Sequence, residues 1–182
     1  MTTQNIRNYQ SQSVSGDDIQ LDITELDLNT TEIVISNLKF RANRSTALKI
    51  LSLSVLLLGG SLIFQSVILY AALIVFISIR FYCFTCLVQS EKLTVTNDFG
   101  VQLLTTYTLG RTRSLFVQFA HIHDVVIDEV IQNLKVTFML AFLTKGSWFE
   151  KRPIIPIVNT INPRLDVLKI VYNILRKYIG RS

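Results

Sequence analysis

The sequence predicts an α+β membrane protein, in which a polar N-terminal tail and a transmembrane helical hairpin precede an antiparallel β domain closed by a C-terminal helix. Three observations support this prediction. First, thirty consecutive residues, 50–79, carry no charge. Second, these are followed by several short segments in which apolar and polar residues alternate, separated by turns. Third, the chain ends with an amphipathic helical pattern. The hydrophobic fraction of 49% and the mean hydropathy of +0.41 agree with a small membrane-attached protein.

Residues 1–31 are expected to form a disordered polar and acidic tail. Gln, Asn, Ser, Thr and Asp dominate this part of the chain, and large apolar side chains are few. Such a composition does not bury enough apolar surface to offset the entropy of ordering. Residues 32–46 are expected to form a strand and then a basic segment next to the membrane, because Ile33 and Ile35 would share one strand face.

Residues 47–88 are expected to cross the membrane. A spanning helix needs about 20 apolar residues, and the uncharged run would make one helix of roughly 45 Å against a hydrocarbon core of about 30 Å. Either a single strongly tilted helix or a helical hairpin would absorb the excess length. Basic residues flank both ends of the run and prefer the cytoplasmic side, which favours the hairpin. Its bend is expected near Gly59 and Gly60, where the helix formers are weakest.

Two cysteines, Cys83 and Cys86, lie inside this apolar region. A Cys-x-x-Cys pair can be a redox centre or half of a zinc site. Neither further ligands nor a thioredoxin-like setting accompanies this pair, so we interpret the residues as buried apolar thiols or as a palmitoylation site at the membrane boundary.

Residues 91–182 are expected to form an antiparallel sheet or partly closed barrel. Segments rich in β-branched and aromatic residues are separated by turns such as Asn97–Gly100 and Leu109–Arg111, with no helical pattern between them. A helix is expected over residues 163–179, because a proline suits its first position and its apolar residues fall on one stripe. That stripe predicts that the helix packs on the sheet.

No catalytic constellation stands out in the sequence. His121 and His123 would share one strand face, but a metal site needs a third ligand, so surface or interface histidines are the simpler interpretation. Asp128 and Glu129 are adjacent and would face opposite ways, as at a solvated strand end. There is no phosphate-binding loop, no nucleophile elbow and no basic cluster interleaved with aromatic residues. We therefore expect no cofactor, no metal and no nucleic-acid partner.

Seven residues are candidates for contact with a partner or a membrane. The arginines after Gly110 are able to touch a phosphate, although a polar hairpin turn explains them equally well. A tryptophan flanked by cations is typical of an interfacial anchor, and a partner contact is the competing interpretation. The seven candidates are Arg111, Arg113, Phe116, Phe119, Trp148, Lys151 and Arg152.

Four segments of the chain together resemble the PIG-H family. They read EKLTVTNDFGVQLLTTYTLGR (91–111), FVQFAHIHDVVIDEVI (116–131), VTFMLAFL (136–143) and NPRLDVLKIVYNILR (162–176). Each motif alone is degenerate. Their joint order, their spacing and their position after the apolar run are specific.

The resemblance implies a non-catalytic subunit of the endoplasmic-reticulum complex that transfers N-acetylglucosamine from its UDP donor to phosphatidylinositol, the first step of GPI-anchor synthesis. It implies partners: a separate catalytic subunit of the PIG-A type, the other subunits of the complex, and the lipid of the endoplasmic-reticulum membrane, with the β domain on the cytoplasmic side. It also implies a pleckstrin-homology-like fold. The alternative is a membrane-tethered module unrelated to GPI synthesis that binds a protein or a lipid headgroup, the latter through Arg111, Arg113, Lys151 and Arg152.

Overall fold

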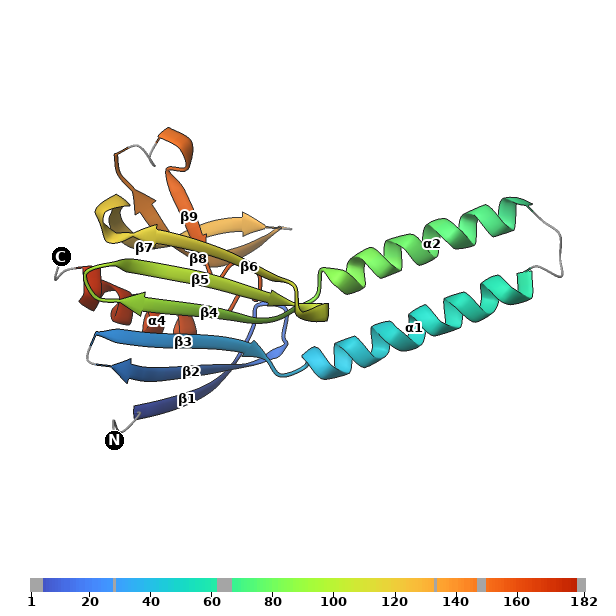
Figure 1. The fold of residues 1–182 in the computed structure, drawn as a ribbon, viewed down its shortest axis with the longest axis horizontal. Coiled ribbons are helices and arrows are strands. Elements are labelled where there is room, and N and C mark those ends of the chain that lie inside the picture. Colours follow the sequence, from blue (N-terminus) through green and yellow to red (C-terminus); the bar gives the residue numbers. More distant parts are fainter. Residues whose placement is uncertain (1–4, 28, 62–66, 133, 147–149, 180–182) are drawn as a thin grey trace.

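The computed structural model describes residues 5–27, 29–61, 67–132, 134–146 and 150–179. Two antiparallel sheets and a C-terminal helix form one body, and two long helices project from one end of it (Figure 1). The strands and long helices are β1 Asn5–Gln12, β2 Asp18–Asp27, β3 Thr30–Asn37, α1 Phe40–Ser61, α2 Val67–Thr85, β4 Val88–Thr96, β5 Gly100–Tyr107, β6 Thr112–Gln118, β7 Ile122–Gln132, β8 Lys135–Thr144, β9 Ile154–Ile157 and α4 Leu165–Ile179. Two short 3-10 turns, η2 Thr108–Gly110 and η3 Phe119–His121, complete the described elements.

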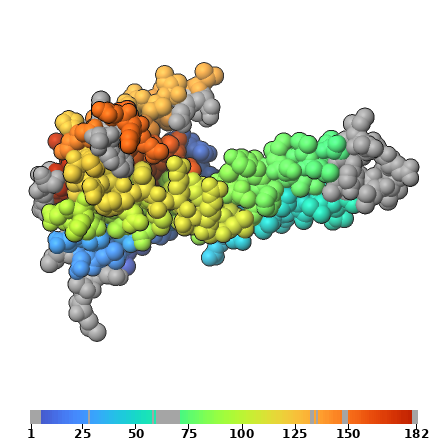
Figure 2. All heavy atoms as spheres, turned by 45° about the horizontal axis from the view of Figure 1, so that its top comes forward, coloured from blue at the N-terminus to red at the C-terminus, as the bar shows by residue number. Residues whose placement is uncertain are grey.

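The larger sheet has the strand order β1-β2-β3-β4-β5-β6, and the smaller has the order β7-β8-β9. β3 and β4 pair directly although α1 and α2 separate them in sequence, with Ile33 opposite Leu93 and Ile35 opposite Glu91. The two helices are therefore an insertion between neighbouring strands. They lie side by side and form one arm that extends away from the sheets (Figure 2).

The core lies between the larger sheet, the smaller sheet and α4. Each element contributes the apolar residues of one face, because strand side chains alternate between the two faces and the apolar residues of α4 follow a helical stripe. The core residues include Leu21, Ile33, Leu93, Val101, Val117, Leu140, Phe142, Leu168, Val171 and Leu175. A hydrogen bond of 2.6 Å between the hydroxyls of Thr31 and Tyr178 links β3 to α4.

The N-terminal segment is ordered over residues 5–27, so the prediction of a disordered tail is wrong. β1 and β2 extend the larger sheet beyond β3, and Ile19, Leu21 and Ile23 are buried in the core. These three residues alternate with polar ones, so the strand has one apolar face that can be buried although its mean composition is polar.

The predicted membrane span is also wrong. Among the described residues, no helix combines the length and the apolar character that crossing a membrane requires. The uncharged run is divided between two helices. In α1 the uncharged part is Ile50–Ser61, about 18 Å long, and in α2 the part before Arg80 is Val67–Ile79, about 20 Å long.

The structure is thus an α+β fold with two antiparallel sheets and three helices over the described residues. The expected single sheet or partly closed barrel is replaced by two sheets, because η3 turns the chain between β6 and β7.

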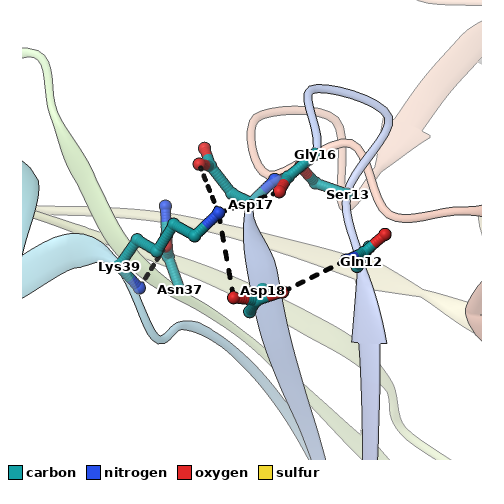
Figure 3. A network of polar contacts seen from close by, with 7 residues as sticks. All are labelled: Gln12, Ser13, Gly16, Asp17, Asp18, Asn37 and Lys39. Carbon is teal, nitrogen blue, oxygen red and sulfur yellow. Dashed lines mark hydrogen bonds and ion pairs between the residues drawn. The ribbon is translucent and has the colours of Figure 1, made fainter.

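A polar network connects the turn after β1 to the start of α1 (Figure 3). The ammonium of Lys39 donates a hydrogen bond of 3.0 Å to the carbonyl oxygen of Gly16 and lies 3.9 Å from Asp17 and 3.7 Å from Asp18. The side chain of Asn37 accepts a hydrogen bond from the backbone of Lys39. These exposed contacts join the N-terminal strands to the base of the helical arm.

Candidate functional site

A cavity of about 190 Å³ lies between the inner face of β3–β6 and the segment that contains β9. Strand register explains its walls. Residues opposite one another on adjacent strands form two rows across the larger sheet, and both rows line the cavity. The first row is Ile35, Glu91, Thr105 and Arg113, and the second is Ile33, Leu93, Leu103 and Leu115.

The first row changes from apolar to charged along its length. Ile35 is buried, Glu91 is buried, Thr105 is half-buried and Arg113 is exposed. The second row is apolar throughout. The cavity therefore has an apolar wall and a polar rim.

Glu91 fixes the segment that forms the opposite wall. Its carboxylate accepts hydrogen bonds from the backbone N–H of Thr160 at 3.1 Å and from that of Ile161 at 3.3 Å. Burial raises the pKa of the Glu91 carboxyl above its ordinary value, and the hydrogen bonds from Thr160 and Ile161 oppose part of that rise. Both carboxylate oxygens are thus used to hold the chain that follows β9.

Two arginines line the rim of the cavity, and a third lies next to a residue that lines it. Arg113 of β6 and Arg152, just before β9, both line the cavity and are exposed. The guanidinium of Arg111 lies 5.5 Å from the ring centroid of Tyr107, and Tyr107 also lines the cavity. Within the described ranges none of the three arginines forms an ion pair. Three of the predicted contact residues therefore gather around one cavity, and their charges are available to an anion.

The remaining predicted contact residues are scattered. Phe116 is 47% exposed on the outer face of β6, whereas Phe119 is only 7% exposed and packs in the core, so its ring is not available to a partner. Lys151 is exposed but is not among the residues that line the cavity. Trp148 lies outside the described residues.

Other chemical groups do not converge in the described part of the chain. No set of three or more His, Cys, Asp or Glu side chains there is arranged to hold a metal ion. His121 belongs to η3 and His123 to β7, so the two do not share a strand face as predicted. Cys83 and Cys86 are free and exposed, which contradicts the interpretation of buried thiols.

Sequence reasoning missed Glu91, Tyr107 and Thr160. A signal for Glu91 was present, because in β4 it shares a face with Leu93 and Val95, where alternation predicts an apolar residue. A charge in an apolar position indicates a buried carboxylate with specific partners. Those partners come from a segment about 70 residues away, which no local pattern predicts.

Comparison with known proteins covers most of the residues that line this cavity. Residues 92–157 match the family described as "PIG-H: GPI-GlcNAc transferase complex, PIG-H component". This range extends from β4 to the end of β9 and includes Arg111, Arg113 and Arg152.

Mammalian relatives match a longer part of the chain. Proteins named as the H subunit of phosphatidylinositol N-acetylglucosaminyltransferase are 29% identical over 121 residues in Homo sapiens and 30% identical over 121 residues in Bos taurus, which is 65% of this chain and 64% of each relative. The Mus musculus protein of the same name is 28% identical over 97 residues, 52% of each chain. The chain thus spans between about half and just under two thirds of the length of these relatives.

No solved structure matches the chain, so none supports the pleckstrin-homology-like fold that the resemblance implies. The family match and the three mammalian relatives agree with the resemblance seen in the sequence. Residues 92–157 of this chain are thus similar to the PIG-H family.

Proposed function

We propose that this protein is the PIG-H subunit of a GPI-GlcNAc transferase complex, which transfers N-acetylglucosamine from UDP-N-acetylglucosamine to phosphatidylinositol. The observation that carries the proposal is the family match over β4–β9, the part of the fold that contains the cavity and its arginines. The names of the human, bovine and mouse relatives support the same reaction.

We further propose that the subunit is non-catalytic and positions a separate glycosyltransferase subunit of the PIG-A type. The role of Glu91 supports this proposal, because its buried carboxylate accepts backbone hydrogen bonds from Thr160 and Ile161 and so holds the chain after β9 in place. The proposed location is the cytoplasmic side of the endoplasmic-reticulum membrane, where the lipid acceptor resides.

A surface for the catalytic subunit is proposed on the outer face of β5 and β6. Phe116 is exposed there opposite Gln102, and Phe99 is 70% exposed in the adjoining turn between β4 and β5. Exposed aromatic side chains are frequent anchors of protein interfaces.

Affinity purification of the tagged full chain from a membrane extract tests the proposal. A glycosyltransferase subunit is expected among the recovered proteins, and Phe116→Ala is expected to lower its recovery. Ile131→Ala is the matched control, because Ile131 is exposed to 77% on the other sheet. Recovery of the chain without any glycosyltransferase would contradict the proposed function, and equal loss in both variants would contradict the proposed surface.

A further inference from the structure

We propose that the cavity between β3–β6 and the β9 segment binds the headgroup phosphate of an anionic glycerophospholipid. Arg113 and Arg152 contact the phosphate, with Arg111 beside them, and the apolar wall contacts the glycerol and the first methylenes of an acyl chain. This inference goes beyond the proposed function, which assigns no ligand to the chain.

The charge at the rim is built from separate parts of the fold. Arg113 comes from the larger sheet and Arg152 from the segment leading into the smaller one, and both side chains reach the same cavity. Guanidinium groups match phosphate oxygens with two parallel hydrogen bonds, which makes arginine the favoured residue for such an anion. The absence of an ion pair at either residue within the described ranges leaves both guanidiniums able to bind a ligand.

The negative charge of Glu91 does not neutralise these arginines. Glu91 lies in the same cross-strand row as Arg113, two strands away, which places their backbones about 10 Å apart. Its oxygens face the N–H groups of Thr160 and Ile161, whose positive ends offset the charge. The anion site is thus at the rim and the carboxylate is at the inner wall.

The size of the cavity and its second row argue for an amphiphile. A volume of about 190 Å³ is below the roughly 300–1,000 Å³ of sites that enclose a whole small molecule, so only part of a ligand fits inside. A free phosphate or a nucleotide would leave the partly exposed side chains of Leu103 and Leu115 in contact with water. A phospholipid covers that wall and also supplies the phosphate for the arginines.

The cavity extends from the middle of the larger sheet toward the end from which the helical arm projects. β3 ends and β4 begins there, and η2 between β5 and β6 contacts α2 (Figure 1). Exposed apolar side chains at this end include Leu109, which is 65% exposed in η2, and Phe81 and Tyr82 of α2. The acyl chains of a bound lipid therefore have apolar surface beside them outside the cavity.

Vesicle flotation of the purified full chain tests the site. Phosphatidylcholine vesicles with and without phosphatidylinositol are compared, because apolar attraction to the helical arm is common to both and the difference reports the anionic headgroup. Removing one arginine is expected to lower the phosphatidylinositol-dependent binding about fivefold, and Arg113→Gln with Arg152→Gln about thirtyfold, from the usual contribution of each cation near anionic lipid.

A matched control carries the same loss of charge away from the cavity. Arg164→Gln with Arg176→Gln removes two exposed arginines at the two ends of the C-terminal helix. The control is expected to retain most of the binding. An equal loss in both double variants would overturn the proposal, because it would show only a general attraction of positive charge to the anionic vesicles. Unchanged binding in the cavity variant would also overturn it.

Soluble competitors separate the possible sources of phosphate. Inositol 1-phosphate, UDP-N-acetylglucosamine and inorganic phosphate are each expected to compete weakly, because none of them covers the apolar wall. Effective competition by any of these three compounds would overturn the lipid assignment in favour of a soluble phosphate compound. If the cavity variant binds vesicles normally but no longer recovers the glycosyltransferase subunit, the arginines form a protein interface and the lipid assignment is overturned. The vesicle assay needs no partner protein, so its failure is distinct from failure of the proposed function.

Discussion

The wild-type protein is expected to lose stability as the pH rises above 4.5, the ordinary pKa of the Glu91 carboxyl, and Glu91→Gln is expected to remove this loss. Burial raises the pKa of Glu91 in the folded state, while the unfolded chain has the ordinary value of 4.5. Between these two values the folded protein keeps a proton that the unfolded chain has already released. The contribution of Glu91 to the free energy of unfolding therefore falls as the pH rises through this interval and changes no further above it.

The size of the effect on folding follows from the hydrogen bonds of the carboxylate. Glutamine keeps one oxygen as an acceptor, so one of the two backbone N–H groups loses its partner. The N–H of Ile161 belongs to a buried residue, whereas Thr160 is exposed and reaches water. Leaving a buried donor unsatisfied costs about 1–3 kcal/mol, so Glu91→Ala is expected to destabilise the fold by about that amount. Glu91→Gln is expected to cost less and to show no dependence on pH from this site.

Urea unfolding of the three proteins across the range from about pH 4 to about pH 7 measures this difference. Glu32→Gln is the control, because Glu32 is a carboxylate on the neighbouring strand that pairs with Lys92 at 2.8 Å on the outer face. A partly exposed surface pair of this kind contributes at most about 1 kcal/mol. Parallel pH profiles for the wild type and Glu91→Gln would refute the reasoning, because they would show that Glu91 ionises as easily in the fold as in the unfolded chain.

Two further predictions concern the backbone. Gly100→Ala is expected to lower the free energy of unfolding by about 2–5 kcal/mol, since Gly100 has φ +155° and an added Cβ would collide with the carbonyl oxygen of Val117. Gly16→Ala is the control, because Gly16 has φ +87° but open space around it, and its free energy of unfolding is expected to fall by only about 1–2 kcal/mol. Equal losses in the two variants, measured by thermal unfolding, would contradict the collision at Gly100. Leu134→Asn is expected to raise the free energy of unfolding by about 0.5–1 kcal/mol, because Leu134 is 100% exposed at φ +61°, and an unchanged melting temperature would contradict this strain.

The strands after the helical arm and the terminal helix could be predicted from local patterns. Alternation identifies β4 and β5, the turn between them contains Gly100, and the apolar stripe of α4 was visible in the sequence. The N-terminal strands were missed because a count of residue types over residues 1–31 hides the alternation of Ile19, Leu21 and Ile23. Composition averages over both faces of a strand, and only one face needs to be apolar.

The apolar run was misread for the opposite reason. The predicted hairpin already divided the run into two helices, but a count of uncharged residues took these helices to cross a membrane, whereas no helix among the described residues is long and apolar enough to do so. The cavity was beyond local reasoning altogether. It depends on the register that places Thr105 between Glu91 and Arg113, and on a hydrogen bond that the backbone N–H of Thr160 donates to Glu91 across 69 residues of sequence.

Transfer of N-acetylglucosamine to phosphatidylinositol in microsomes tests the proposed function most directly. Microsomes from cells that lack this chain are supplied with labelled UDP-N-acetylglucosamine, and the labelled lipid product is measured. The product is expected to be lost without the chain and restored when the wild-type chain is expressed again. Formation of N-acetylglucosaminyl-phosphatidylinositol at the normal rate without the chain would contradict its assignment as a required subunit.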